Sequence, residues 1–589
     1  MIDAHDTITG GRFLAQSIAP GDVFTREDLT EEHRLFGQTA AEFMRHEVVP
    51  REQQLYAHDW ALTRALLRKA AELDLTRLEI PSAYGGLGLD KISAAYVGEQ
   101  LAVNPSFAGS LGAHTSIGTL PIVYFGTDDQ KARYLPRLAS AELIGAYALT
   151  EPQSGSDALA ARTTAVLTPD GRHYLLNGQK AWITNGGFAD LFTVFAKVDG
   201  ERFTAFLVER GMGVVSGPDE KKLGLDGSST TVLMLDNVRV PVENVLGTIG
   251  QGHKVAFNIL NLGRVKLGTR NIAGVRQAIG HATRYARERR QFDRAIAEFG
   301  LIKHKLAEMA VRCYVGDAMV YRTLGDVDRA LSAVDPADGV RVLKTIEAFA
   351  VECSINKVWT SEALAFAVDE AVQVFGGNGY SREFPVERAY RDARITRIYE
   401  GTNEINRLII PTRLLKQSAG LFSADGVRRA QSDRSSSTRS SSAQADGPLA
   451  AERDLLTCAK RLVVAALGQA AATYGDALKD EQEVLGHAAD LVIEVYAVES
   501  ALARTDKLLA GSAAERGSLA SDIARVYASD AADRLAHSGK QIAAALSAHG
   551  DSEPLGGLVR EVATRPGIDT IAARRRIADA VIQAGRHIF

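Results

Sequence analysis

The sequence contains few cysteines and no long apolar run, and each absence excludes a class of protein. Its three cysteines, Cys313, Cys353 and Cys458, lie far apart and form no CxxC pair. Neither a disulfide-stabilised secreted domain nor a structural metal site is therefore expected. No stretch of 18 consecutive apolar residues is present, whereas a membrane-spanning helix needs about 20. We expect no metal and no transmembrane segment.

The N-terminal segment and the overall charge exclude further classes. Residues 1–10 contain two aspartates and no lysine or arginine, which argues against a secretory signal and against an Arg-rich transit peptide. A net charge of −4 and a pI near 6.4 give no general attraction to nucleic acid or to an anionic membrane. We expect a cytoplasmic bacterial protein, or a chain that has lost its presequence.

Two nucleotide-binding motifs are also missing. The glycine-rich stretch Pro81–Gly88 is not followed by Gly-Lys-Ser/Thr, so it predicts a turn and not a phosphate-binding loop. No GxGxxG follows a predicted strand, which argues against a Rossmann NAD site.

The hydrophobic periodicity divides the 589 residues into blocks. Helical spacing begins at Thr30, a period of two begins near Ala146, and helical spacing returns near Val255. Short strands are predicted at Thr163–Leu167, Tyr174–Leu176, Ala181–Thr184, Leu191–Val198, Phe203–Val208 and Thr230–Leu235. Asn177-Gly178, between two of them, predicts a tight hairpin turn.

These blocks predict a mainly α fold with a central antiparallel β domain and an appended C-terminal helical domain. The predicted domains are an N-terminal helical domain (1–145), a β domain (146–254), a second helical domain (255–419), a Ser-rich flexible linker (420–447) and a C-terminal helical domain (448–589). The linker is predicted because Ser432–Ser442 has nothing to bury. Residues 449–589 carry 16 basic and 19 acidic residues, which disfavours nucleic acid as a partner.

Four segments carry a family resemblance: Ala146–Asp157, Ala181–Gly187, Gln373–Gly379 and Tyr399–Glu404. In order and spacing they resemble the acyl-CoA dehydrogenases over residues 30–415, and the additional length resembles the very-long-chain branch. The resemblance implies that FAD is bound non-covalently between the β domain and the second helical domain. It also implies dehydrogenation of acyl-CoA to trans-2-enoyl-CoA in β-oxidation, with hydride transfer to flavin N5. Such a reaction requires a redox cofactor, because no side chain accepts a hydride.

The segment Tyr399–Glu404 alone fits a surface glutamate in a turn between helices, since Gly401 permits positive φ and Thr402 can cap the next helix. The resemblance implies that Glu400 is the base that removes the α proton. A carboxylate in a dry site is a stronger base than one in water. The position that carries the base in some branched-chain relatives corresponds here to Gly263, which cannot act. Gly401 is implied to contact the substrate, and Thr402 and Glu404 the cofactor.

Further cofactor residues are implied by the other segments. A period of two places Trp182 and Thr184 on one strand face and Ile183 on the other, so that the indole shields the flavin; a half-buried strand with a core tryptophan is the alternative. The first segment is implied to contribute Tyr147, Ala148, Leu149, Thr150, Gly155 and Ser156. A neighbouring subunit is implied to contribute Arg289, Gln291, Gln373, Gly376 and Gly377.

Substrate binding is implied for Ser156, Asn261 and Arg264, although many relatives carry aspartate where this chain has Asn261. Phe107–Gly112 corresponds to the closed end of the acyl tunnel in medium-chain relatives. Ala108 and Gly112 are four residues apart and share a helix face, so they predict a gap and a preference for long straight chains, about C12 and above. Close helix packing is the alternative explanation for these small residues.

The implied partners are acyl-CoA, an electron-transferring flavoprotein and a second copy of the chain in a homodimer. Contact with a membrane surface through the linker or the C-terminal domain stays open. Two other functions also stay open. One is a flavin oxidase that reduces O₂, and the other is a non-enzymatic binding or assembly protein that uses the C-terminal domain.

Overall fold

The computed structural model describes residues 10–16, 18–336, 338–432, 447–511, 514–549, 553–564 and 568–589. Contacts divide the chain into two units. The first comprises 1–28, 274–330 and 348–589, and the second comprises 29–273 and 331–347. These units group the residues differently from the domains predicted above, whose boundaries remain a prediction.

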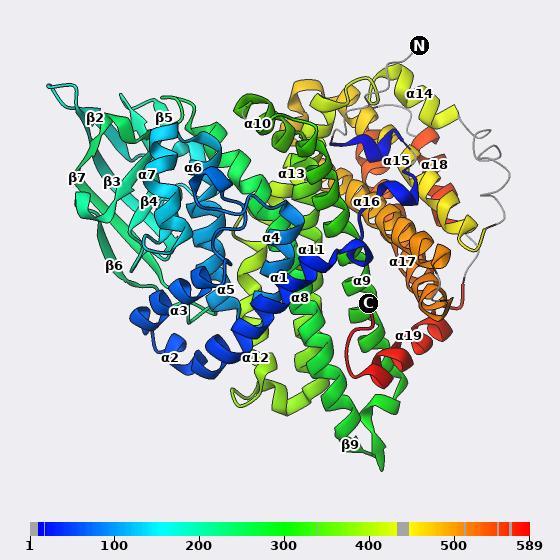
Figure 1. Cartoon of the computed structure of the whole chain (residues 1–589). Coiled ribbons are helices and arrows are strands. Elements are labelled where there is room, and N and C mark those ends of the chain that lie inside the picture. Colours follow the sequence, from blue (N-terminus) through cyan, green and yellow to red (C-terminus); the bar gives the residue numbers. More distant parts are fainter. Residues whose placement is uncertain are drawn as a thin grey trace. The chain divides into compact units, whose positions relative to one another are not determined.

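The second unit contains an eight-stranded sheet (Figure 1). Seven strands follow the order β6-β7-β3-β2-β4-β5-β8, and β1 pairs with β4. The strands are β1 (Gly145–Ala148), β2 (Thr164–Leu167), β3 (His173–Thr184), β4 (Leu191–Val198), β5 (Arg202–Glu209), β6 (Val215–Asp219), β7 (Thr230–Pro241) and β8 (Val245–Leu246). Most pairs are antiparallel, as predicted, but β4 pairs in parallel with β1 and β2.

Helices cover both faces of this sheet. On β4, Phe192 and Val194 join a core cluster with Phe43 and Phe107 from the helices on one side. Phe195 joins a second cluster, which contains residues of α7. Because successive strand residues point to opposite faces, this alternation explains why β4 is apolar along most of its length. The helices are α1 (Glu31–Phe43), α2 (Glu52–Tyr56), α3 (Trp60–Glu72), α4 (Lys91–Leu101), α5 (Pro105–Gly112), α6 (Leu120–Phe125), α7 (Asp128–Ala139) and α10 (Gly339–Ala348).

The hairpin predicted at Asn177-Gly178 is wrong. Strand β3 runs through both residues, and its register with β7 shifts between Leu176 and Gly178. Glycine is required there for a different reason, since a Cβ on Gly178 would lie 2.8 Å from the Cα of Thr163. The dipeptide thus marks a bulge where two strands approach closely.

In its described residues, the first unit is helical apart from a two-stranded hairpin, β9 (Arg290–Gln291) and β10 (Arg294–Ala295). Helix α8 (Gly252–Glu288) passes from the second unit into the first at Gly274. The other helices are α9 (Gly300–Ser332), α11 (Ala350–Phe375), α12 (Pro385–Ala393), α13 (Asn403–Gln417), α14 (Ala424–Ser432), α15 (Ala450–Tyr474), α16 (Gln482–Ala510), α17 (Ala514–Ser547), α18 (Glu553–Ala563) and α19 (Thr570–Ala584). Helix α14 lies inside the predicted linker, and 433–446 lie outside the described residues.

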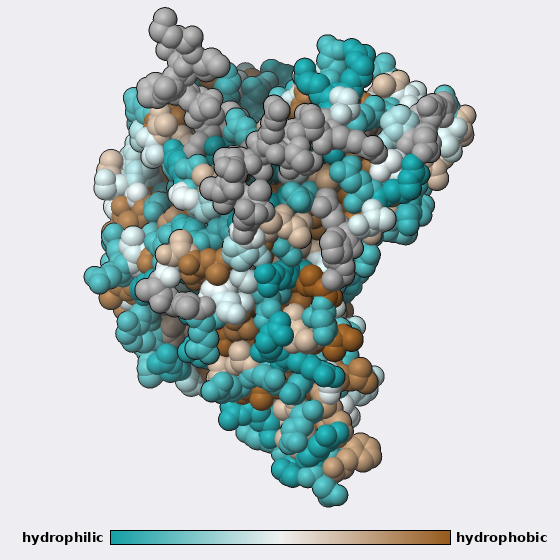
Figure 2. Space-filling view, turned by 90° about the vertical axis from the view of Figure 1, so that its right-hand side faces the viewer, coloured by the Kyte–Doolittle hydropathy of each residue, from teal (hydrophilic) through white to brown (hydrophobic). Residues whose placement is uncertain are grey.

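The C-terminal helices form a bundle on the right of Figure 1. Among the described residues, Ala450–Asp480 is long and apolar enough to cross a membrane, but 67% of its apolar window is buried, as expected for a core helix. Figure 2 shows the corresponding side of the molecule as mostly hydrophilic, with apolar residues in small groups. On α19, Arg574 is paired with Glu308 and Arg576 with Asp522.

Candidate active site

The loop that follows β1 is held in place by the carboxylate of Glu151. It accepts hydrogen bonds from the backbone N–H groups of Arg162 (2.6 Å) and Thr163 (3.1 Å), and from the Thr163 hydroxyl (2.5 Å). Lys180 Nζ, on β3, lies 2.6 Å from its Oε1. The backbone of Glu151 and Ser154 closes the loop with two reciprocal hydrogen bonds of 3.0 Å. The loop 150–156 is therefore fixed to the sheet.

Sequence reasoning overlooked Glu151 and Lys180. The sequence offers little signal, because Lys180 lies between two predicted strands and follows the polar residues Asn177 and Gln179, where a lysine is normally solvated. Burial opposes ionisation of Glu151, but Lys180 and the Thr163 hydroxyl outweigh it, so the pKa of this carboxyl is lowered. The pair fixes the loop from which Thr150, Gly155 and Ser156 were predicted to bind the cofactor.

Trp182 lies at a bulge in β3 and, as the period of two predicts, on the face opposite Ile183. The register between β3 and β7 shifts between Lys180 and Ile183, and Trp182 takes the left-handed conformation with φ of 60°. Its side chain is 60% exposed, whereas Ile183 is 2% exposed. A bulge re-aims a side chain, and strained backbone of this kind clusters at ligand sites. The alternative of a core tryptophan is thus wrong.

Helix α8 supplies two of the four predicted substrate residues. Asn261 and Arg264 are both buried, and Arg264 Nη1 donates to Asn261 Oδ1 at 3.0 Å. Their spacing of three residues places them on one helix face. The amide oxygen of Asn261 thus accepts from the Arg264 guanidinium, as a carboxylate oxygen at this position could.

The predicted gap beside Ala108 and Gly112 is present as a small cavity of about 50 Å³, which both residues line together with Arg270. Both residues lie on α5, and Arg270 of α8 extends over them, its Nη1 donating to the Ala108 carbonyl at 3.2 Å. A Cβ on Gly112 would be 2.4 Å from the same nitrogen. The small residues on α5 thus leave a cavity and also make room for an arginine far along the chain.

Glu400, in the first unit, sits on strained backbone. Its φ is 59° and that of Gly401 is 79°, so two consecutive residues adopt the left-handed conformation, which costs non-glycine residues of order 1–3 kcal/mol. The fully buried Asn406 compensates, because its Nδ2 donates to the carbonyls of Glu400 (3.4 Å), Gly401 (2.8 Å) and Thr402 (3.0 Å). Sequence reasoning missed Asn406, although an asparagine inside the apolar run of the following helix was a signal.

The helix that follows Glu400 begins as predicted. Thr402 is the N-cap of α13 and accepts from the Ile405 N–H at 3.2 Å. The backbone N–H of Glu404, the Thr402 hydroxyl and the charges of Arg407 and Lys357 lower the pKa of the Glu404 carboxyl, which is exposed. Lys357 Nζ donates to Asn403 Oδ1 at 2.6 Å, which anchors the first turn of α13 to α11.

The second predicted cofactor segment is brought together within the first unit. Tyr285 stacks on Phe375 with ring centroids 4.0 Å apart, and Asn378 Nδ2 donates to the Tyr285 hydroxyl at 3.0 Å. These contacts join the end of α8, which leads into Arg289 and Gln291, to the loop 373–379. The hairpin of β9 projects at the lower end of the view (Figure 1), and Phe292 at its tip is 88% exposed.

The residues present fit a flat, anionic cofactor. Gly155, Gly376 and Gly377 have open space where a Cβ would stand, so a ligand can approach their backbone closely. Ser156, Arg289 and Gln373 are exposed. Trp182, Thr184 and Ser156 belong to the second unit, and Glu400, Arg289 and Gln373 to the first.

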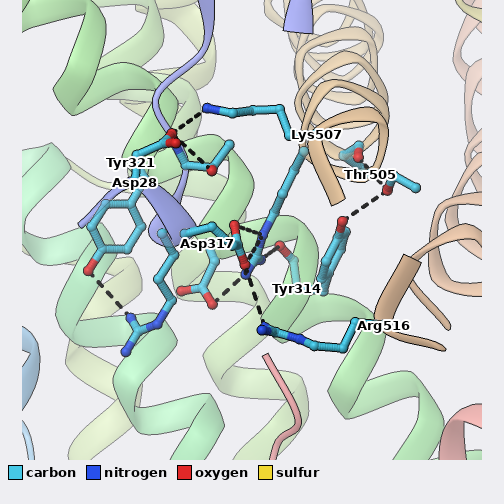
Figure 3. A network of polar contacts seen from close by, with 12 residues as sticks. Asp28, Tyr314, Asp317, Tyr321, Thr505, Lys507 and Arg516 are labelled. Carbon is cyan, nitrogen blue, oxygen red and sulfur yellow. Dashed lines mark hydrogen bonds and ion pairs between the residues drawn. The ribbon is translucent and has the colours of Figure 1, made fainter. Parts of the chain in front are cut away.

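One cluster of potential metal ligands is present among the described residues. Side-chain atoms of Cys313, Asp317 and His587 lie within 4.8 Å of one another, and all three residues are buried. Asp317 is already paired with Arg276 at 2.6 Å and lies 3.7 Å from Arg504; Figure 3 shows the polar network around it. Burial raises the pKa of the Cys313 thiol to about 12. The guanidinium groups of Arg276 and Arg504 and the protonated Cys313 thiol disfavour a cation at this cluster. The absence of a metal remains a prediction.

Comparison with known families covers most of the chain. Models described as acyl-CoA dehydrogenase N-terminal, middle and C-terminal domains match residues 30–142, 146–238 and 250–415. A further model, also described as an acyl-CoA dehydrogenase C-terminal domain, matches 458–555. Every predicted site residue falls within the first three matches.

Individual relatives agree with these matches. A probable acyl-CoA dehydrogenase of Bacillus subtilis is 43% identical over 99% of both chains. The human mitochondrial very long-chain specific acyl-CoA dehydrogenase is 45% identical over 58% of this chain and 51% of its own length. The crystal structure of an acyl-CoA dehydrogenase from Bacillus anthracis, complexed with FAD, is 41% identical, covers 99% of this chain and 100% of its own, and superposes with a TM-score of 0.95.

Proposed function

Because this chain belongs to the acyl-CoA dehydrogenase family, we propose that it converts long, straight-chain acyl-CoA to trans-2-enoyl-CoA in fatty acid β-oxidation, with Glu400 as the base. The chain is an oxidoreductase with FAD as its cofactor. When bound, FAD supplies the acceptor for the β hydride. The remaining work belongs to residues of the chain.

The observation that carries the proposal is the position of Glu400 on strained backbone braced by Asn406. A residue whose backbone is fixed in this way loses little conformational freedom when the substrate binds. Its carboxylate can therefore be positioned toward one hydrogen of the substrate. Trp182, exposed on its bulge, offers a flat apolar surface to a flavin. Thr150, Gly155 and Ser156 lie on the loop that Glu151 fixes, and they are proposed to contact the same cofactor.

Two observations bear on the acyl specificity. The similarity to very long-chain specific relatives supports long chains, whereas the cavity beside Gly112 is small and is bordered by Arg270. We further propose an electron-transferring flavoprotein as the acceptor, a homodimer in which Arg289 and Gln373 serve the neighbour's FAD, and a cytoplasmic location. Membrane contact through the C-terminal domain is not required by any of these.

Anaerobic reduction of the FAD-loaded enzyme tests the base. Glu400→Gln should retain FAD and the fold but bleach the flavin about 10²–10⁴-fold more slowly with dodecanoyl-CoA, because the amide cannot accept a proton. Glu383→Gln, at an exposed glutamate of the same unit that belongs to none of the predicted sites, is the matched control and should reduce normally. Bleaching of Glu400→Gln at the wild-type rate contradicts the assignment. Repeating turnover with the flavoprotein acceptor and with O₂ separates a dehydrogenase from an oxidase.

A further inference from the structure

A small cavity lies inside the second unit, between α4, α5 and α8. It encloses about 50 Å³, enough for a few ordered waters or one small polar group. One side of its wall is apolar and includes Leu78, Val97, Leu101 and Leu111. The cavity is therefore too small for several methylene groups of an acyl chain, but it is large enough for the terminal group of such a chain.

The other side of the wall is charged. Lys266, Arg270 and Glu79 line the cavity. Glu79 is the one carboxylate among the lining residues, and it is shared between Lys266 and Lys91, whose Nζ is 3.0 Å from Glu79 Oε1. Burial lowers the pKa of Lys266, and the charges of Lys91 and Arg270 lower it further. Positive charge thus exceeds negative charge around this space.

Two polar groups at the cavity have hydrogen-bonding capacity left over. The one hydrogen bond found for the Arg270 guanidinium among the described residues goes to the Ala108 carbonyl, from Nη1. The hydroxyl of Ser116, which lines the cavity and is 7% exposed, has no hydrogen-bond partner in the described part of the chain. Buried polar groups are nearly always paired, so these two point to a polar ligand.

The cavity and the proposed substrate residues share helix α8. Arg270 is six residues along α8 from Arg264, which corresponds to about 9 Å along the helix axis at 1.5 Å per residue. Ala108 and Gly112, the residues expected beside the end of the acyl chain, line the cavity together with Arg270, so a chain that ends beside them would meet Arg270. This step rests on the proposed function, which places acyl-CoA on this helix.

We propose that this cavity receives the far end of the acyl chain and that Arg270 selects chains ending in a carboxylate, so that ω-carboxyacyl-CoA thioesters are the preferred substrate class. The carboxylate pairs with the planar fork of the guanidinium, the geometry that arginine matches best. The Ser116 hydroxyl donates to the same group. A methyl end leaves the half-buried guanidinium without this acceptor, and a site built for a polar group rejects an analogue that lacks it.

The test measures binding without turnover. Full-length, FAD-loaded enzyme is titrated by calorimetry with two 3-thia-acyl-CoA analogues of equal length, one ending in a methyl group and one in a carboxylate. The variants are Arg270→Met, which removes the charge at similar length, and Arg270→Gln, which keeps donors without charge. Arg284→Met is the matched control, an exposed arginine on the same helix. FAD absorbance reports whether each variant is folded.

Wild type and Arg284→Met should bind the carboxylate analogue more tightly than the methyl analogue. Arg270→Met should reduce this preference by roughly 10- to 100-fold, the range for a hydrogen bond to a charged group, and Arg270→Gln should also reduce it. Equal binding of both analogues by wild type, or a preference that survives both substitutions, overturns the proposal. If the enzyme binds the carboxylate analogue selectively but dehydrogenates no acyl-CoA, only the proposed function is refuted. If it dehydrogenates methyl-ended and carboxylate-ended chains without selecting between them, only the role of Arg270 is refuted.

Discussion

Lys180 Nζ and Glu151 Oε1 lie 2.6 Å apart, with both side chains almost completely buried. The pair connects the middle of β3 to the loop that follows β1. Trp182 stands two residues beyond Lys180, and Gly155 and Ser156 stand four and five residues beyond Glu151. One ion pair therefore fixes both stretches of the second unit that are proposed to contact FAD.

Glu151→Gln should lower both FAD occupancy and thermal stability. Removing one partner of a buried pair leaves an uncompensated charge, at a cost of about 3–5 kcal/mol. Flavin absorbance per protein and the melting temperature measure the two effects. The double variant Glu151→Gln, Lys180→Met should recover stability in part, because it removes both charges. A single variant as stable as wild type would contradict the role of the pair.

The same carboxyl gives a pH dependence. Its pKa in the folded chain is lowered from 4.5, so its contribution is fully present above pH 4.5 and is lost as the pH falls through the folded pKa. FAD should therefore dissociate more readily in acid. The Glu151→Gln variant should lack this component of acid release, which flavin fluorescence can follow.

His114 should make the chain sensitive to mild acid. Its Nδ1 accepts from the Gly145 N–H and its Nε2 donates to the Leu138 carbonyl, both at 3.0 Å. Burial lowers its pKa to about 4 from 6.5. Between these values the unfolded chain binds a proton that the folded chain does not, so stability falls from pH 6.5 to 4, by about 3 kcal/mol.

Denaturant titrations at several pH values check this prediction. His114→Gln keeps a donor and an acceptor without a charge, and should flatten the curve between pH 4 and 6.5. His46→Gln, at an exposed position, should leave the curve unchanged. An unaltered slope in His114→Gln would show that another group is responsible.

Asn406→Leu should slow the reaction without removing the cofactor. Its amide holds three successive carbonyls, from Glu400 to Thr402, and leucine has similar volume but no donor. We expect kcat to fall about 10- to 100-fold, since a small displacement of a positioned group is costly, whereas KM and FAD content should change little. A parallel loss of FAD would indicate a general structural role.

Arg289→Ala should lower FAD occupancy if this side chain reaches the FAD of a neighbouring subunit. Arginine is suited to phosphate because its guanidinium is planar and always charged. Arg290→Ala is the control, since the neighbouring Arg290 bonds to the Asp293 carbonyl of its own hairpin. Flavin content and solution scattering measure the outcome. A monomer with full FAD would contradict the proposed dimer site.

The sequence by itself determined the class of fold and the identity of the catalytic candidate. Local periodicity places β4 at Leu191–Val198, with the same bounds in the structure, because alternation along a strand depends only on which residues are apolar. Glu400 is identified by the order and spacing of four short segments. The sequence also predicts Thr402 as the N-cap of α13, because an N-cap side chain bonds to a backbone N–H only three residues further along the chain.

Only the tertiary structure decided how several of these residues are oriented. Trp182 points outward where β3 shifts register against β7, and Asn177-Gly178 lies inside β3 at another register shift, with Thr163 close beside Gly178. Arg270, 158 positions further along the chain, lies against Gly112. Periodicity describes neighbours in sequence, whereas the space beside a residue is shared with side chains from distant segments. For that reason the sequence predicts a gap beside Gly112, but only the structure shows that this cavity is small and is lined by Arg270, Lys266 and Glu79.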